Sequence, residues 1–544
     1  MFYDDPALTL DRVLTTMAVE GTDDERFREV MRSQLGPKQR AREFVAAELG
    51  PGIPVRFTRH HVAHAASAFF PSPFDEAAIL TMDGVGEWET TSLAVGEGAS
   101  LTPVQSIEFP HSLGLLYSSV TRYCGFKVNS GEYKLMGLAP YGTPIYQDLI
   151  RENLIALHED GSFALNLDYF AFGRGDGMTT ARFDELFGGP PREQESAISR
   201  REMDIAASIQ AVTEDAVLGL ARNARERTGK RHLCLAGGVA LNCVANGRLL
   251  REGIFDDIWI QPAAGDAGGA LGAAYIGYHA LADAEPRKAG ARDAQKGSYL
   301  GSLYSMPEVR AELGMDNAVF TEIEDDIERA ETVASLLADG NVVGFFAGRM
   351  EFGPRSLGGR SIIGDPRNPA MQVQLNLKIK YRESFRPFAP AVLEDRVSEY
   401  FELDRPSPYM LLVAPVAEER CIEYDRSAFD EGDDDMLSVV RVERSDLPSI
   451  THVDYSARVQ TVQSETNPRF HELLSAFERQ TGCGVLVNTS FNVRGEPIVA
   501  SPRDAYRCFM RTEMDVLVVE DAILYKQDQP SWKEDDDWRA RYDD

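Results

Sequence analysis

The sequence predicts a mixed α/β protein made of two successive α/β units, and two patterns lead to this prediction. Residues 203–285 alternate between helix-like and strand-like segments, and a glycine turn and a helix follow each strand-like segment. Sheets covered by helices produce this alternation. A second run of the same kind begins at about residue 328, after a polar segment over 284–305. We therefore predict domains over residues 1–310 and 328–530.

The elements before residue 203 follow from periodicity and glycine turns. Residues 1–50 carry apolar side chains at helical spacing, which predicts helices. Between 53 and 142 the pattern changes to short strands, with a buried strand over 77–82 and its hairpin partner over 91–95. Residues 143–200 are rich in Gly, Asp and Phe and are predicted to form an irregular insertion.

The elements after residue 203 complete the first unit. The pattern predicts an amphipathic helix over 203–225, strands over 233–235 and 258–260, and an alanine-rich helix over 270–282. Residues 527–544, seven of which are acidic, are predicted to form a solvated tail.

Composition excludes several functional classes. The chain has 544 residues, 43% of them hydrophobic and 26% charged, with a formal net charge of −30. Such a charge predicts no binding to nucleic acid or to an anionic membrane surface. No apolar run approaches the roughly 20 residues that span a bilayer. The start has no basic and apolar signal pattern, and the six scattered cysteines predict reduced thiols, so we expect a cytoplasmic protein.

Two histidines provide the first candidate site. His60 and His64 are four residues apart, so on a helix both imidazoles project from one face. This spacing suits two ligands of one metal ion. A helix with hydrogen-bonded histidines and no metal is the alternative.

Asp83 provides a carboxylate near the same point. It follows the buried strand over 77–82 and precedes a glycine turn, and such carboxylates commonly face a ligand crevice in α/β sheets. An aspartate that caps its own loop is the alternative.

Two strand–glycine–helix turns, at 233–242 and 258–272, complete the first candidate site. Each places backbone N–H groups and a helix N-terminus where an anion or nucleotide could bind. Asp266 lies in the second turn, and with the two histidines and Asp83 it would make a site that suits divalent iron, manganese or zinc. The candidate nucleotide-binding residues are Gly237, Gly238, Val239, Asn242 and Gly265.

A local excess of basic residues marks the second unit. Residues 341–390 contain eight basic and three acidic side chains in a chain of net charge −30. This concentration predicts a pocket for a small, multiply charged anion; basic side chains paired with an acidic surface are the alternative. The eight basic residues are Arg349, Arg355, Arg360, Arg367, Lys378, Lys380, Arg382 and Arg386.

Several motifs resemble the O-carbamoyltransferase family of the NodU/CmcH type. They occur in family order along nearly the whole chain. The motifs are His-His-Val-Ala-His at 60–64, Met-Asp-Gly-Val-Gly-Glu at 82–87, His-Ser-Leu-Gly-Leu-Leu-Tyr at 111–117, Ser-Gly-Glu-Tyr-Lys-Leu-Met-Gly-Leu-Ala-Pro-Tyr-Gly at 130–142, Gly-Gly-Val-Ala-Leu-Asn at 237–242, Phe-Gly-Pro-Arg-Ser-Leu-Gly-Gly-Arg-Ser at 352–361, Arg-Pro-Phe-Ala-Pro at 386–390 and Asn-Thr-Ser-Phe-Asn-Val-Arg-Gly-Glu-Pro at 488–497.

The resemblance implies an N-terminal actin-like ATPase fold, similar to the tRNA threonylcarbamoyl-transfer ATPases, followed by a YrdC-like α/β domain. It implies that carbamoyl phosphate and ATP, with Mg²⁺, form carbamoyl adenylate in the second domain. The carbamoyl group would then pass, shielded from water, to a hydroxyl of a small-molecule acceptor in the first domain. Residues 143–200 would shape acceptor choice.

The resemblance also assigns roles to the candidate residues. His60, His64, Asp83 and Asp266 would bind a divalent metal, with iron expected and manganese or zinc as alternatives. Lys380 and Arg355 would be catalytic together with His60, His64 and Asp83. The carbamoyl phosphate and adenylate site would contain Arg355, Lys380, Arg386, Arg458, Asn488 and Ser490.

The oligomeric state stays open, and a homodimer is one option. Two other functions also stay open. The first is threonylcarbamoyl transfer to tRNA, which the net charge disfavours, and the second is a catalytically silent nucleotide-binding protein. Family members usually begin with an additional glycine-rich strand hairpin, whereas residues 1–6 resemble the segment after it. Either the start of the chain is placed too late, or strands are missing from the middle of its first sheet. Missing strands would leave buried backbone groups unpaired, so we expect the chain as written to be poorly stable or inactive in carbamoyl transfer.

Overall fold

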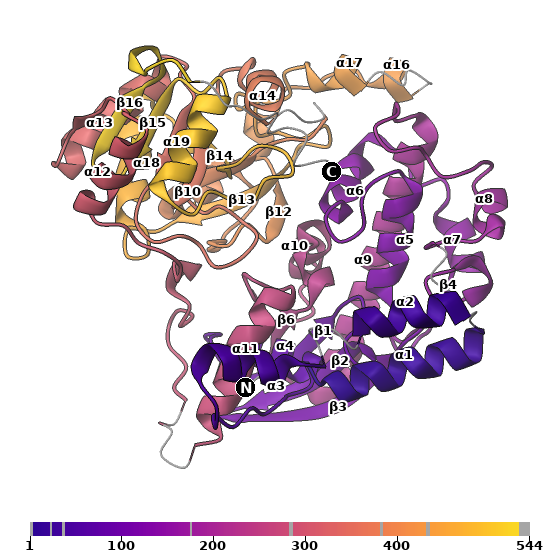
Figure 1. The fold of residues 1–544 in the computed structure, drawn as a ribbon. Coiled ribbons are helices and arrows are strands. Elements are labelled where there is room, and N and C mark those ends of the chain that lie inside the picture. The colour runs from indigo at the N-terminus through magenta and orange to yellow at the C-terminus, as the bar shows by residue number, and fades with distance from the viewer. Residues whose placement is uncertain are drawn as a thin grey trace. The chain divides into compact units, whose positions relative to one another are not determined.

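The computed structural model describes residues 4–21, 24–34, 39–173, 177–281, 285, 287–380, 385–430 and 436–532. The chain divides into two compact units, Met1–Ala294 and Gln295–Asp544. Figure 1 shows the ribbon with its elements labelled.

The first unit begins with three helices, α1 (Pro6–Glu20), α2 (Asp24–Gln34) and α3 (Ala41–Leu49). The side chain of Asp5 accepts the N–H of Ala7, which caps the start of α1. The helices predicted for residues 1–50 are therefore confirmed in the part of that segment that the structure describes.

A five-stranded sheet forms the centre of the first unit. Its order is β3-β2-β1-β6-β7, in which β1, β2 and β3 run antiparallel and β6 and β7 continue parallel to β1. The predicted hairpin of residues 77–82 and 91–95 is confirmed as β1–β2. The interior strand β1 is paired on both sides, with β2 and with β6. The strands are β1 (Glu76–Met82), β2 (Glu89–Glu97), β3 (Ser100–Glu108), β6 (His232–Ala236) and β7 (Asp257–Ile260).

Helices cover both faces of this sheet. Successive side chains of β1 point to opposite faces, so they contact helices on both sides. Ala77 and Ile79 pack in one apolar cluster with Phe69 of α4 (His60–Phe69). Leu80, on the other face, lies near Leu220 of α9 (Arg200–Thr228). The predicted helix over 203–225 is thus confirmed as part of α9, whose start is fixed by a capping box of Ser199 and Glu202.

Further helices of the first unit precede β6 or follow β6 and β7 along the chain. The strands predicted over 233–235 and 258–260 are confirmed as β6 and β7, and the helix predicted over 270–282 begins earlier, at Asp266. These helices are α5 (Leu113–Tyr123), α6 (Glu132–Leu138), α10 (Cys243–Arg251) and α11 (Asp266–His279), with a single turn, η3 (Gly238–Leu241), between β6 and α10.

The insertion over 143–200 is more ordered than predicted. It contains α7 (Gln147–Asn153), the hairpin β4 (Ile155–Leu157) and β5 (Phe163–Leu165), and α8 (Ala181–Leu186). The physical reason is an aromatic cluster in which the rings of Phe183 and Phe187 pack against Tyr123. Its phenylalanines, counted as a sign of irregularity, form a small core.

The second unit is built on a mixed nine-stranded sheet of order β12-β13-β11-β14-β10-β9-β15-β16-β8. Two pairs, β9–β15 and β11–β13, are parallel, and the others are antiparallel. The strands are β8 (Thr321–Glu322), β9 (Val343–Phe346), β10 (Arg360–Gly364), β11 (Ala389–Leu393), β12 (Leu412–Pro415), β13 (Ser456–Val462), β14 (Val485–Ser490), β15 (Val516–Val519) and β16 (Ala522–Tyr525).

Helices α13 and α18 pack against each other in this unit, as Figure 1 shows. The mixed α/β class predicted for the chain is confirmed in both units. The helices are α12 (Met306–Met315), α13 (Asp326–Ala338), α14 (Met371–Gln374), α15 (Val397–Tyr400), α16 (Ser427–Asp430), α17 (Met436–Val440), α18 (Pro468–Thr481) and α19 (Pro502–Arg511), and a π-helix, Leu375–Lys380, continues α14.

Residues 295–310 are joined to the second unit, although the sequence analysis places them at the end of the first domain. Gly301 donates its N–H to the carbonyl of Met350 (2.9 Å), and Arg360 donates to the carbonyl of Ser302 (3.1 Å). Polar composition alone does not reveal such long-range backbone pairing.

Three further predictions concern the whole chain. All six cysteines are free thiols, five of them buried, as the sequence predicts. No helix among the described residues has the length and apolarity required to cross a membrane. Most of the predicted tail over 527–544 lies outside the described residues.

Candidate metal centre and anion site

Asp83 is held in place by the turn that follows β1. Its Oδ1 accepts the N–H groups of Gly84 (2.8 Å) and Gly238 (3.2 Å), and Ser112 Oγ donates to its carbonyl (3.1 Å). Gly237 has a φ of 87°, and a Cβ there would lie 2.1 Å from the carbonyl oxygen of Met82. This close approach of two strand ends leaves Asp83 Oδ2 facing α4.

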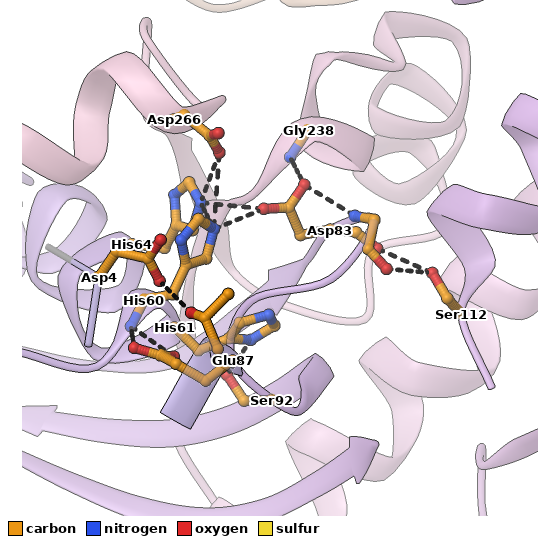
Figure 2. Close-up of polar contacts among 12 residues, drawn as sticks. Asp4, His60, His61, His64, Asp83, Glu87, Ser92, Ser112, Gly238 and Asp266 are labelled. Carbon is orange, nitrogen blue, oxygen red and sulfur yellow. Dashed lines mark hydrogen bonds and ion pairs between the residues drawn. The ribbon is translucent and has the colours of Figure 1, made fainter. Parts of the chain in front are cut away.

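His60 and His64 meet Asp83 on the buried face of α4. The two imidazole Nε2 atoms are 3.0 Å apart, and they lie 2.9 Å and 3.1 Å from Asp83 Oδ2. Figure 2 shows these side chains and Asp266 pointing toward one another. The four-residue spacing on one helix therefore has the geometric consequence that the sequence predicts.

Asp266 joins this group from α11. Its Oδ1 lies 3.5 Å from His60 Nε2 and 3.8 Å from His64 Nε2. Helix α11 approaches α4 so closely that a Cβ on Gly272 would lie 1.8 Å from the carbonyl oxygen of Ala63. The side chain of Asp266 is 65% exposed whereas that of His64 is fully buried, so the cluster is open to solvent on its Asp266 side.

The four residues fit a divalent cation. One ligand atom from each lies within 4.8 Å of all the others. Ligands that bind one ion at about 2.1 Å and at right angles to each other are about 3.0 Å apart, which matches the three shortest distances. Two imidazoles and two carboxylates are a donor set that iron, manganese and zinc accept.

The charges of the cluster favour a cation as well. Burial alone would lower the pKa of His64, but hydrogen bonds from Asp266 and Asp83 and their negative charges raise it to about 9. Burial would raise the pKa of Asp83, yet the two imidazoles hold it well below its usual range. The carboxylates thus stabilise positive charge at this point.

His61 does not belong to this group. Its Nδ1 hydrogen-bonds Ser92 Oγ of β2 (3.0 Å), and burial lowers its pKa to about 3. His61 is therefore a neutral core residue, although it lies between the two candidate ligands in the sequence.

The two glycine turns of the first unit are connected through their backbones. The N–H of Gly237 donates to the carbonyl of Ala264 (2.8 Å), next to Gly265, the N-cap of α11. Asn242 caps α10 and exchanges two hydrogen bonds with Gln210 of α9 (2.9 and 3.1 Å). Val239 lies in the single turn η3 between these residues.

In the second unit, Lys380 is buried at the end of the π-helix. Its ammonium group donates to Ser490 Oγ (3.2 Å), to the carbonyl of Ser490, and to the carbonyl and Oδ1 of Asn492 (both 2.9 Å). The structure thus brings Lys380 and Ser490 together. Asn492 is a partner that sequence reasoning missed, although it lies in the motif at 488–497.

Asn488 lies two residues before Ser490 on β14. Its side-chain amide donates to Gln460 Oε1 (2.6 Å) and to the carbonyl of Ser356 (3.1 Å). These bonds connect β14 and β13 to the loop that carries Arg355. Arg458 lies on β13, and Arg386 lies three residues before β11, the strand between β13 and β14.

Glu351 organises the Arg355 loop and was missed by sequence reasoning. Its buried Oε1 accepts the N–H groups of Leu357 (2.7 Å), Gly359 (2.7 Å) and Arg360 (3.2 Å). A carboxylate that binds several N–H groups in one loop fixes the loop's path. The Gly-Pro and Gly-Gly pairs around Arg355 could have pointed to a constrained loop, but not to its anchor.

Part of the predicted basic cluster has structural partners instead. Arg360 is fully buried, donates to the carbonyls of Gly348 and Gly359, and stacks on Phe346. Arg367 and Lys378 form ion pairs, and Arg382 lies outside the described residues. The local charge count therefore overstates the anion site, because it does not distinguish cations that are already paired.

Two family models match the chain. "Carbamoyltransferase N-terminus" matches residues 20–275, and "Carbamoyltransferase C-terminus" matches residues 334–526. The first covers the residues of the candidate metal centre, and the second covers those of the candidate anion site.

Relatives resemble the chain over most of its length. An uncharacterised protein of Synechocystis is 56% identical over 100% of this chain and 89% of its own length. Nodulation protein NolNO of Sinorhizobium fredii is 38% identical over 91% of this chain and 68% of its own length. Nodulation protein NolO of Bradyrhizobium diazoefficiens is 38% identical over 86% and 79%, respectively.

Among solved structures, HypF of T. kodakarensis is 16% identical, with a TM-score of 0.22 over 44% of this chain and 38% of that chain. A full-length HypF in its phosphate- and nucleotide-bound form has a TM-score of 0.24 over 42% and 43%. These scores are too low to bear on the fold or the site.

Proposed function

The chain belongs to the carbamoyltransferase family and is an enzyme that transfers carbamoyl groups, and from this premise we propose an ATP-dependent O-carbamoyltransferase. Carbamoyl phosphate would be the donor, and a hydroxyl of a sugar or natural product the acceptor. The proposal includes an actin-like first domain, which the strand order β3-β2-β1-β6-β7 supports, a YrdC-like second domain, and a cytoplasmic location.

The first half-reaction would take place in the second unit. Water would first hydrolyse carbamoyl phosphate to carbamate and phosphate; a carbamate oxygen then attacks the α-phosphorus of ATP, so that carbamoyl adenylate forms and pyrophosphate leaves. Lys380, which donates to oxygens of Ser490 and Asn492, would place positive charge near the phosphates. Arg355, Arg386 and Arg458 would contribute further positive charge, and Asn488 would hold the Arg355 loop in place.

The second half-reaction would take place at the candidate metal centre. His60, His64, Asp83 and Asp266 would hold the ion, which when bound supplies Lewis-acid polarisation of the carbamoyl carbonyl. The turn at 237–242 would line the AMP leaving group, and the N-terminus of α11 would orient it. The acceptor oxygen then bonds to the carbamoyl carbon, and the bond to AMP breaks.

The proposal rests on two imidazoles and two carboxylates whose ligand atoms lie within 4.8 Å of one another. All four residues lie in the segment that the N-terminal carbamoyltransferase family model matches. The test is to supply ATP, Mg²⁺ and labelled carbamoyl phosphate and to look for enzyme-bound carbamoyl adenylate. Pyrophosphate release that requires carbamoyl phosphate is the expected result. Nucleotide binding without pyrophosphate release would instead indicate a catalytically silent protein.

A further inference from the structure

Helix α4, which carries both candidate histidine ligands, has no local side-chain cap at its N-terminus. Its N-cap residue, Arg59, makes no side-chain capping bond, and the helix has no acidic residue in its first turn and no basic residue in its last. The first N–H groups and last carbonyls of any helix need partners from elsewhere. Nearly all of α4 is buried. At its C-terminal end Ser72 Oγ donates to the carbonyl of Phe69 (2.7 Å), and further partners at both ends come from distant parts of the chain.

Glu87 supplies the partner at the N-terminal end. Both of its carboxylate oxygens accept the N–H of His60 (2.9 and 3.1 Å), and Oε1 also accepts the N–H of Asp5 (2.9 Å). Figure 2 shows Glu87 at the backbone of His60, on the side away from the ligand cluster. The Glu87 side chain is buried, so these bonds are shielded from water.

Arg287 supplies the partner at the C-terminal end. Its guanidinium group donates to the carbonyls of Phe69 (3.0 Å), Phe70 (3.0 Å) and Ser72 (2.9 Å). The same group lies 4.3 Å from the ring centroid of Phe69, the last residue of α4. One cation therefore binds three backbone carbonyls at the end of α4 and just beyond it.

We propose that Glu87 and Arg287 form a clamp that sets the position of α4 along its own axis and thereby positions His60 and His64 for metal binding. The inference rests on the proposed metal centre. Both histidines are on α4, whereas Asp83 and Asp266 are on other elements, so an axial shift of α4 displaces two ligands together relative to the other two. An acceptor at the N-terminus and a cation at the C-terminus also match the helix macrodipole.

The experiment measures Mn²⁺ affinity of the full chain by calorimetry, together with thermal unfolding of the metal-free protein. The variants are Glu87→Ala, Glu87→Gln, Arg287→Met and Arg287→Lys. Glu202→Gln is the matched control, since the buried Glu202 also accepts a backbone N–H at a helix start, that of Ser199 at 2.9 Å, but α9 carries no candidate metal ligand.

We expect Glu87→Ala to weaken Mn²⁺ affinity about tenfold or more, as loss of outer-sphere partners of metal ligands typically does. Arg287→Met should weaken it severalfold. Glu87→Gln and Arg287→Lys, which keep one acceptor and the charge respectively, should restore part of the loss. Glu202→Gln should lower the unfolding temperature and leave Mn²⁺ affinity unchanged. Cobalt substituted for manganese should show an altered absorption spectrum in Glu87→Ala.

Folded Glu87→Ala and Arg287→Met proteins that bind Mn²⁺ like the wild type would overturn the clamp and leave the proposed function intact. If Glu87→Ala does not fold, Glu87→Gln and Arg287→Met decide in the same way. Failure of the wild type to bind Mn²⁺, Fe²⁺ or Zn²⁺ would instead overturn the metal centre, and with it both proposals.

Discussion

The two candidate sites differ in how their polar groups are arranged. In the first unit, two side chains of α4, one from the turn after β1 and one from α11 point at one another, with two imidazole nitrogens only 3.0 Å apart. In the second unit, Lys380 is surrounded by oxygens of Ser490 and Asn492, and the candidate arginines lie along neighbouring strand ends and one loop. Under our proposal, an added cation completes the first arrangement, whereas the second presents protein cations to an added anion.

The largest effect that this comparison predicts is loss of the metal in an Asp83→Ala variant. Asp83 Oδ2 lies closer to both imidazoles than the carboxylate of Asp266 does, so its removal should weaken Mn²⁺ affinity more than the roughly 10–100-fold that outer-sphere changes cause. Calorimetry with Mn²⁺ measures this. Adenylate formation in the second unit should continue, and its loss would show that the two sites are not separate.

For Lys380→Met we expect the opposite result: adenylate formation is slowed and metal binding is not affected. Removing one preorganised cation from a phosphate site should slow pyrophosphate release about 100–1,000-fold, while Mn²⁺ affinity stays at the wild-type value. Lys378→Met is the control, because Lys378 lies two residues away in the same π-helix and pairs with the exposed Glu513. Equal rates for both variants would contradict the role of Lys380.

A smaller effect is predicted where α11 meets α4. Gly272→Ala would place a Cβ 1.8 Å from the Ala63 carbonyl oxygen, so α11 must move, at a cost of about 1–3 kcal/mol in the free energy of unfolding. Because Asp266 begins α11, Mn²⁺ affinity should fall as well. Gly137→Ala, where no atom lies within 4 Å of the added Cβ, should leave both unchanged in urea titrations and calorimetry.

The smallest effect concerns Lys526, a half-buried lysine near the C-terminal end of the second unit. Burial lowers its pKa to about 8, below the roughly 10.4 of an unfolded chain. The unfolded state therefore binds more protons between these values, and the burial penalty, complete below pH 8, is relieved as the pH rises toward 10. Lys526→Met should remove this increase in stability, and urea titrations of both proteins from pH 7 to 10 measure it. Parallel pH profiles would contradict the assignment.

Local patterns predicted the elements that carry the candidate metal ligands. Helical spacing placed His60 and His64 on one face of α4, and the apolar run before Asp83 predicted β1 and its hairpin partner. The aromatic-rich segment over 143–200 was wrongly predicted to be irregular, because its order depends on contacts with Tyr123 outside it. The local charge count similarly could not show that Arg360 is buried against backbone carbonyls.

The sequence by itself determined which side chains have the right chemistry, because ligand type and helical or strand spacing are local properties. Only the tertiary structure decided how those side chains are held. Glu87 and Arg287 reach opposite ends of α4, and Gly272 allows α11 to bring Asp266 to the histidines. Contacts between residues so far apart in the chain depend on how helices pack on a sheet, which no short sequence window encodes.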